Sequence, residues 1–137
     1  MFQAQTQIRV RYAETDQMGY VYYGNYSTYY EVARVETLRA MGLTYKQLED
    51  EGILMPILEN NSKYIAPAFY DDLLTVKVSI PKRPGIRIQF NYEIYNQNNN
   101  LIHTGETLLV FINEVSRKPC PMPTTMEKLL TPYFDEK

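Results

Sequence analysis

The sequence predicts an α+β domain in which an antiparallel β-sheet carries one long α-helix on a face. A helical pattern of apolar residues at 25–41 is followed, after one further short helix, mainly by strand-like segments with short turns between them. In the clearest of these, 74–80 and 86–94, apolar and polar residues alternate, which is typical of strands with one buried face. Helices do not alternate with these strands, which argues against a doubly wound parallel sheet.

The first strand and the long helix are predicted from the spacing of their apolar residues. From Ile8 to Tyr12 every second residue is apolar, which predicts a strand at 7–12. In the long helix, apolar residues recur at helical spacing, and a glycine follows at once, as is common after a last helical residue. The predicted buried stripe of this helix is Tyr26, Tyr29, Tyr30, Ala33, Thr37, Ala40 and Met41.

The remainder of the chain is expected to add a short helix, further strands and a final helix. Thr44 suits the N-cap position of a short helix that ends near residue 51, because its hydroxyl can accept a hydrogen bond from a helical amide. The next strand, 53–66, is expected to be interrupted at Pro56 or at Asn60-Asn61. The last strand is apolar on both sides near its end and is therefore expected in a central position. The remaining expected elements are strands at 74–80, 86–94 and 101–113 and a helix at 124–133.

Length and composition narrow the class of protein. With 137 residues the chain is expected to form one domain, 1–137, large enough for a hydrophobic core. A net charge of -2 argues against a general nucleic-acid-binding protein, which needs a basic face. The first residues lack the basic and apolar regions of a signal peptide, and no segment has the roughly 20 apolar residues that span a membrane. Cys120 is the only cysteine, so an internal disulfide is impossible and a cytoplasmic location is expected.

The segment 12–34 combines an acidic loop with the start of the long helix. It begins Tyr-Ala-Glu-Thr-Asp-Gln-Met-Gly-Tyr-Val-Tyr-Tyr-Gly-Asn-Tyr and ends Tyr-Glu-Val-Ala-Arg. Asp16 therefore precedes a helix N-terminus, where its carboxylate can act as base or nucleophile while free backbone amides hold a polarised carbonyl oxygen. The alternative is that Asp16 only forms an Asx turn and that Gly19 and Gly24 only permit a turn.

The pattern Tyr-x-x-Thr-Asp-x-x-Gly-x-Val-Tyr-x-x-x-Tyr, followed by Tyr-Glu-x-Ala-Arg, resembles the signature of the 4-hydroxybenzoyl-CoA thioesterase family. The resemblance covers nearly the whole chain, since the order of the later elements also fits. It implies the hotdog fold, in which an antiparallel sheet wraps around a long central helix. It also implies hydrolysis of an acyl-CoA to a free acid and CoA without a metal or cofactor. Members assemble as homodimers, often paired into homotetramers, with active sites shared across the dimer seam.

Most other catalytic motifs are absent from the sequence. His103 is the only histidine, and in the middle of a predicted strand it is expected to pack or to lie at the surface. The chain has no Gly-x-Ser-x-Gly, P-loop, dinucleotide or His-Glu-x-x-His motif, and too few His and Cys residues for a metal site of that type. Carboxylates and backbone groups must therefore carry any catalysis. Thioester hydrolysis suits such a site, because a thiol with a pKa near ~8.5 leaves readily as thiolate.

The resemblance assigns catalytic roles to Asp16, Tyr23 and Glu31. Asp16 matches the catalytic aspartate of the family, and the backbone N–H of Tyr23 matches the group that faces the thioester carbonyl. Many bacterial members carry His at that position, so a mechanism using that imidazole does not transfer to this chain. Glu31 matches the Glu of the helix motif and is expected either to order the active-site loop or to pair with Arg34 on the helix surface. Glu14 is expected near the site, with a turn role as its alternative.

Substrate contacts are expected from two groups of residues. Around the motif loop, the candidates are Gly19, Val21, Tyr22, Gly24, Asn25 and Tyr26, and Gly24 or Asn25 is also the expected N-cap of the helix. The phosphates of CoA need cations, and the available clusters are Lys82, Arg83, Arg87, Arg117 and Lys118. In family members, basic residues at strand ends often receive these phosphates at a subunit interface. The alternative for each cluster is a solvated turn.

Two other functions stay open at the level of the sequence. An acyl-carrier-protein thioesterase would perform the same chemistry on a protein-borne pantetheine. A non-catalytic acyl-CoA-binding module would bind the ligand without turnover, although the presence of Asp16 argues against it. The identity of the acyl group and the role of Asp16 as base or nucleophile are left open as well.

Overall fold

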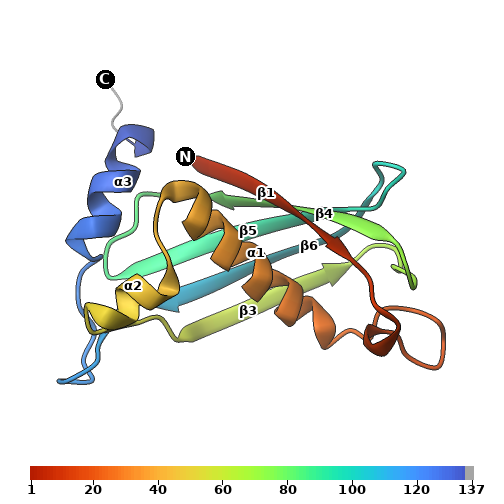
Figure 1. The fold of residues 1–137 in the computed structure, drawn as a ribbon, viewed down its shortest axis with the longest axis horizontal. Coiled ribbons are helices and arrows are strands. Elements are labelled where there is room, and N and C mark those ends of the chain that lie inside the picture. Colours follow the sequence, from red (N-terminus) through yellow and green to blue (C-terminus); the bar gives the residue numbers. More distant parts are fainter. Residues whose placement is uncertain (135–137) are drawn as a thin grey trace.

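The computed structural model describes residues 1–134, so residues 135–137 of the predicted domain lie outside the described residues. Five strands form one antiparallel sheet in the order β1-β4-β5-β6-β3, and α1 lies across one face of it (Figure 1). This confirms the predicted sheet with a long helix on one face. The elements are β1 (Phe2–Arg9), the 3-10 turn η1 (Tyr12–Glu14), α1 (Asn25–Met41), α2 (Tyr45–Asp50), β2 (Ile53–Leu54), β3 (Ile57–Tyr64), β4 (Leu73–Ile80), β5 (Arg87–Tyr95), β6 (Leu101–Val110), β7 (Ile112–Asn113) and α3 (Thr124–Phe134).

The core lies between α1 and the concave face of the sheet. In β4 and β5 every second residue is buried, as the alternating pattern predicts. The helix contributes a stripe rich in tyrosine, and full burial of each large apolar side chain contributes roughly 1.5–3 kcal/mol to stability. The buried residues of α1 are Tyr26, Tyr29, Tyr30, Ala33, Arg34, Thr37, Leu38 and Met41.

Both helix ends follow the local signals of the sequence. Gly24 occupies the N-cap position of α1, and Gly42 follows its last turn with a φ of 100°, a left-handed conformation that favours glycine. The Thr44 hydroxyl accepts a hydrogen bond from the N–H of Gln47 and so caps α2. The predicted N-cap and C′ residues are therefore confirmed, with Gly24 chosen over Asn25.

The first strand lies earlier in the chain than predicted. β1 runs from Phe2 to Arg9 and pairs along its whole length with β4. The prediction of a strand at 7–12 is wrong at both ends, and Tyr12 is 78% exposed instead of buried. The physical reason is η1, which turns the chain away from the sheet directly after Val10 and Arg11.

Three further predictions differ from the structure. The predicted strand 53–66 ends two residues early, at Tyr64, and it is interrupted at Met55 and Pro56, which confirms the first of the two predicted interruptions. β3 runs without a break through Asn60-Asn61, because an exposed edge strand tolerates polar residues. The predicted strand 101–113 stops at Val110; it lies inside the sheet between β5 and β3, while β7 pairs with β2 instead. On α1, Ala40 is exposed, whereas Arg34 and Leu38 take buried positions that the predicted stripe had left out.

We expect Gly105→Ala to destabilise the fold, because a Cβ atom at this position would overlap the Tyr30 hydroxyl and press on the carbonyl oxygen of Asn61. Overpacking of this kind lowers the free energy of unfolding by about 1–3 kcal/mol, which urea denaturation measures. Gly85→Ala is the matched control, since its Cβ meets open space. Equal stability of the two variants would contradict this packing.

Candidate active site

The loop between η1 and α1 is a small hairpin that presents Asp16. The Asp16 N–H donates to the carbonyl of Tyr20 at 2.8 Å, and the N–H of Gly19 donates back to the carbonyl of Asp16 at 2.9 Å. Asp16 Oδ1 accepts hydrogen bonds from the N–H groups of Met18 at 2.9 Å and Tyr20 at 3.3 Å, so the Asx turn exists. Asp16 Oδ2 has no hydrogen-bond partner among residues 1–134, which leaves one oxygen of this partly exposed carboxylate available for chemistry.

Two backbone amides at the start of α1 are available as well. The N–H of Asn25 donates a hydrogen bond to the carbonyl of Tyr22, and the N–H of Tyr26 donates to the carbonyl of Tyr23. The N–H of Tyr22 donates to the carbonyl of Glu14. Within the described part of the chain, the N–H groups of Tyr23 and Gly24 make no hydrogen bond. They lie at the positive end of the α1 dipole, where an oxyanion is stabilised. That the Tyr23 N–H faces a thioester carbonyl stays a prediction.

Asp16 and Tyr23 line the same pocket, which has a volume of about 280 Å³. Its other walls come from the Asp16 hairpin, from Tyr26 on α1 and from the segment that leaves β3. Tyr26 is only 4% exposed, and burial raises its pKa to about 12, so its hydroxyl stays neutral. The remaining lining residues are Met18, Tyr20, Val21, Tyr64, Ile65, Ala66 and Pro67. A small apolar cavity beside a carboxylate and free amides suits an acyl group.

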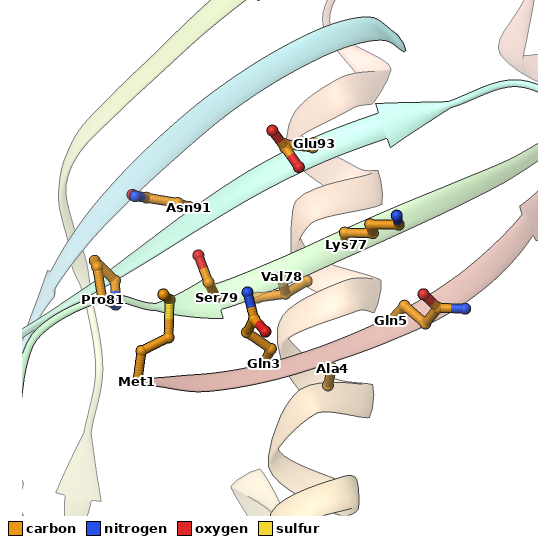
Figure 2. A pocket seen from close by; sticks show the side chains of 10 residues that line it. All are labelled: Met1, Gln3, Ala4, Gln5, Lys77, Val78, Ser79, Pro81, Asn91 and Glu93. Atoms are coloured by element: carbon orange, nitrogen blue, oxygen red, sulfur yellow. The ribbon is translucent and has the colours of Figure 1, made fainter. Parts of the chain in front are cut away.

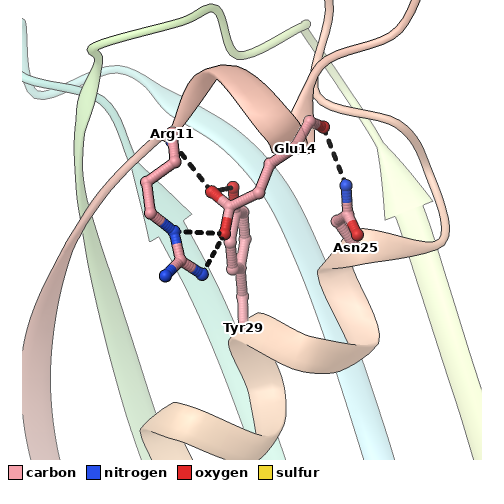
Figure 3. A network of polar contacts seen from close by, with 4 residues as sticks. All are labelled: Arg11, Glu14, Asn25 and Tyr29. Atoms are coloured by element: carbon pink, nitrogen blue, oxygen red, sulfur yellow. Dashed lines mark hydrogen bonds and ion pairs between the residues drawn. The ribbon is translucent and has the colours of Figure 1, made fainter.

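A partly buried polar network joins η1 to α1 (Figure 3). The Glu14 carboxylate accepts hydrogen bonds from the backbone N–H of Arg11 at 2.9 Å, from the Arg11 guanidinium, and from the Tyr29 hydroxyl at 2.8 Å. The Glu14 carbonyl accepts from Asn25 Nδ2 at 2.7 Å. Burial alone would raise the pKa of Glu14, but these donors outweigh it and lower the pKa, so the carboxylate is ionised at neutral pH.

Glu31 lies outside this site. It is exposed on α1 and does not line the Asp16 pocket. The alternative of a surface pair with Arg34 is wrong, because Arg34 is buried and donates to the hydroxyls of Tyr92 at 3.0 Å and Tyr45 at 3.4 Å. Residues three apart on a helix lie about 60° apart around its axis, so the boundary of the buried face can pass between Glu31 and Arg34, and the sequence alone does not place that boundary.

The basic clusters lie at the far end of the sheet from Asp16. Lys82 and Arg83 follow the last residue of β4, and Arg87 begins β5, whereas β4 starts beside the Asp16 end of the molecule (Figure 1). A strand of 8 residues spans roughly 26 Å. Arg117 and Lys118 follow β7 at the same far end. Within one protomer, none of these cations is brought to the pocket.

Of the residues expected around the loop, Val21 and Tyr26 line the pocket, and Gly19 turns the hairpin with a φ of 82°. Tyr22, Gly24 and Asn25 form the entrance to α1. The wall residues from Tyr64, the last residue of β3, to Pro67 were missed. Their only sequence signal is an apolar stretch directly after a polar strand, and pairing of β3 with β6 is what brings them to the hairpin.

A larger hollow of about 770 Å³ lies on the outer face of the sheet (Figure 2). Polar side chains of β1, β4 and β5 stand on it, among them Gln3, Lys77 and Glu93, and Lys77 lies directly opposite Glu93 in the register. Neither a helix N-terminus nor Asp16 faces this hollow. The Asp16 pocket is therefore the better candidate active site despite its smaller size.

Metal binding and membrane crossing have no visible basis in the described residues. Within 1–134, no three His, Cys, Asp or Glu side chains gather as a metal site would require. None of the helices in the same range is long and apolar enough to cross a membrane.

His103 is a packed residue of the core. Its ring is fully buried, stacks on the Tyr26 ring with centroids 4.0 Å apart, and meets Tyr64 edge-on at 4.9 Å. Its Nε2 atom shares a hydrogen bond with the Tyr30 hydroxyl, which also contacts Ser62. Burial lowers the pKa of His103 to about 4. A neutral, enclosed imidazole of this kind supports the packed role among those expected from the sequence.

We expect the buried His103 to make stability depend on pH between its ordinary pKa of 6.5 and about 4. Below pH 6.5 the imidazole is protonated in the unfolded chain but stays neutral in the folded chain. The free energy of unfolding therefore falls by up to about 3 kcal/mol as the pH decreases to 4. Below pH 4 the loss stops growing. Urea denaturation across this range measures it, with His103→Gln as the comparison. An equally steep decline in that variant would contradict the assignment.

Comparisons with known proteins agree with this architecture. Residues 10–130 match the family model of the Thioesterase-like superfamily. The acyl-CoA thioester hydrolase YbgC of Escherichia coli O6:H1 is 32% identical over 119 residues, covering 87% of this chain and 89% of YbgC. A DHNA-CoA thioesterase from Staphylococcus aureus has a crystal structure that is similar with a TM-score of 0.92 at 34% identity, covering 97% of this chain and 91% of that one. The 1,4-dihydroxy-2-naphthoyl-CoA hydrolase of Thermosynechococcus vestitus is 25% identical over 115 residues, 83% of this chain and 79% of the relative.

The fold is therefore the hotdog fold of thioesterases, as the resemblance implied. The chain belongs to the Thioesterase-like superfamily.

Proposed function

We propose that the protein hydrolyses an acyl-CoA thioester, with Asp16 acting at the carbonyl carbon and the N–H groups of Tyr23 and Gly24 binding the carbonyl oxygen. The protein is a thioester hydrolase, since relatives that match most of its length are acyl-CoA thioester hydrolases. The observation that carries the residue assignment is that Asp16, with a free carboxylate oxygen, and Tyr23, with an unpartnered N–H at the start of α1, line the same pocket.

Two routes use these groups. As a general base, Asp16 removes a proton from water while the water oxygen bonds to the carbonyl carbon; the C–S bond then breaks and the thiolate departs with the electron pair. As a nucleophile, Asp16 bonds to the same carbon, the thiolate leaves, and water hydrolyses the resulting anhydride. In both routes negative charge develops on the carbonyl oxygen, where the free amides stabilise it. Loss of one such donor typically lowers the rate about 10²–10³-fold.

The pocket favours a compact acyl group. Its walls carry the aromatic rings of Tyr20, Tyr23, Tyr26 and Tyr64, and its volume is about 280 Å³. Relatives are named for ring-bearing acyl groups such as 1,4-dihydroxy-2-naphthoyl-CoA. We therefore propose an aromatic or short acyl chain in preference to a long fatty acyl chain.

We further propose that a second copy completes the site. β3 is exposed at every position and pairs only with β6 among residues 1–134, so its other edge is open. Antiparallel pairing of two β3 edges about a twofold axis would bring the far end of one protomer beside the Asp16 end of the other. The cations at that end would then reach the CoA phosphates. Such homodimers can pair further into homotetramers. The proposed location is the cytoplasm, where the free Cys120 stays reduced.

We expect Asp16→Asn to reduce turnover by about 10²–10⁴-fold, because the variant keeps the Asx turn but loses the base or nucleophile. Release of thiol from a panel of purified acyl-CoAs measures it. Asp71→Asn is the matched control, since Asp71 is an exposed aspartate in a turn near the same end of the molecule. Turnover of Asp16→Asn near the wild-type rate would remove Asp16 from the mechanism.

The basic clusters offer a second test. We expect Arg87→Glu and Lys118→Glu to raise KM for acyl-CoA about tenfold, the effect of losing roughly 1.4 kcal/mol of phosphate contact. Hydrolysis of the matching acyl-pantetheine, which lacks the nucleotide, should change less than about twofold. Lys46→Glu, an exposed lysine on α2, is the control for net charge. An unchanged KM for acyl-CoA would exclude these cations from the binding site.

The alternative functions predict different measurements. A carrier-protein thioesterase would hydrolyse the acyl carrier protein thioester faster than the matched acyl-CoA. A non-catalytic module would bind acyl-CoA tightly without releasing thiol at any chain length.

A further inference from the structure

We infer that Glu14 is a positioning residue, which sets the separation between the Asp16 carboxylate and the free amides of Tyr23 and Gly24. The inference rests on the proposed function, because it concerns the geometry of that same site. Glu14 does not line the pocket and touches neither Asp16 nor a position for substrate. Its effect on the reaction must therefore pass through the residues that it holds.

The side chain of Glu14 links Arg11, which lies between β1 and η1, to Tyr29 on α1. One carboxylate accepts from the backbone and guanidinium of Arg11 on one side and from the hydroxyl of Tyr29 on the other (Figure 3). Tyr29 is 1% exposed and is fixed in the core, so this bond anchors η1 to a rigid part of the helix. Hydrogen bonds to an ionised group are stronger than bonds between neutral groups.

The backbone of Glu14 holds the segment that carries the free amides. Its carbonyl oxygen accepts from the N–H of Tyr22 at 2.9 Å and from Asn25 Nδ2 at 2.7 Å. These two residues flank Tyr23 and Gly24 on either side. Glu14 also lies only two residues before Asp16 in the chain, so it is linked to both halves of the site.

The other bonds of the hairpin do not perform this task. Thr15 pairs with Val21, Val21 donates to the carbonyl of Ala68, and Tyr20 pairs with Phe69. These contacts hold the hairpin to itself and to the segment before β4, not to α1. Apart from the backbone bonds of Asn25 and Tyr26 to Tyr22 and Tyr23 at the start of the helix, the polar link from the Asp16 loop to α1 is the Glu14 network, formed by Arg11, Glu14, Asn25 and Tyr29. A misplacement of about 1 Å between reacting groups can lower the rate about 10²-fold.

The decisive variant is Glu14→Gln, which keeps the size of the side chain but turns an amide NH2 toward donors of Arg11 or Tyr29. We expect kcat to fall roughly 10- to 100-fold, while KM and the affinity for a non-hydrolysable acyl-CoA thioether change less than about twofold. Assays run well below the melting temperature keep the variant folded. Glu36→Gln is the matched control, because Glu36 forms the same i,i+3 pair with Arg39 on the exposed side of α1.

Tyr29→Phe removes only the bond to the helix and is expected to lower kcat by a smaller factor with the same unchanged KM. Both substitutions remove the same hydrogen bond between Glu14 and Tyr29, so the double variant should be no slower than Glu14→Gln alone. A lower melting temperature with wild-type kcat for Glu14→Gln would overturn the inference, as would independent effects of the two variants.

Amide hydrogen exchange provides a readout that does not depend on activity. In Glu14→Gln, exchange should rise in residues 15–26 and stay unchanged in β4, β5 and β6, whereas unchanged exchange at 15–26 would overturn the inference. If the wild-type protein hydrolyses no acyl-CoA, the proposed function fails, and this measurement still decides whether Glu14 holds the loop.

Discussion

The structure depends on how the N-terminal half of α1 is packed against the sheet. Tyr26, Tyr29 and Tyr30 are buried there within little more than one turn of the helix. Their rings fix the start of α1 above the corner where β3 ends, which is where the Asp16 hairpin also lies. Because these side chains are tyrosines, each also carries a hydroxyl that must be satisfied in the core. One of these residues, Tyr26, also lines the candidate site, so the packing of the fold and the geometry of the site are coupled.

The polar groups of this core form connected chains. Tyr30 joins Ser62 on the edge strand to His103 on β6, and it does so across Gly105, the one position in β6 that has no side chain to obstruct it. Farther along the helix, the Arg34 guanidinium reaches Tyr92, whose hydroxyl contacts Thr107. Buried polar groups with partners favour one arrangement of helix and sheet over others that would leave them unpaired. These contacts therefore fix how α1 lies on the sheet.

Local sequence patterns predicted most of the helices and strands, but they did not predict contacts between residues far apart in the chain. The alternation in β4 and β5, the glycine after α1 and the Thr44 cap are each set by residues next to one another in the chain. The end of β1 was misplaced because the Arg11–Glu14 contact, which turns the chain, leaves no periodic signal. Arg34 was misassigned for a related reason, since only the sheet opposite decides which side of a helix is buried.

In the candidate site, too, the features set by neighbouring residues could be predicted and those set by strand pairing could not. The motif around Asp16 and Tyr23 was readable because the hairpin and the helix start adjoin in sequence. The wall from Tyr64 to Pro67 was not, because strand pairing between β3 and β6 brings it there. The distance between Asp16 and the basic clusters is likewise a property of the sheet, and it is the reason for proposing that a second copy completes the site.

The most direct test of the central claim is a crystal structure with a CoA derivative in which a methylene replaces the thioester sulfur and the carbonyl is kept. The account predicts the ketone oxygen about 2.7–3.1 Å from the backbone nitrogen of Tyr23 or Gly24, with Asp16 Oδ2 facing the carbonyl carbon. A ketone bound elsewhere, for example in the hollow on the outer face of the sheet, or one that turns its oxygen away from these amides, would contradict it.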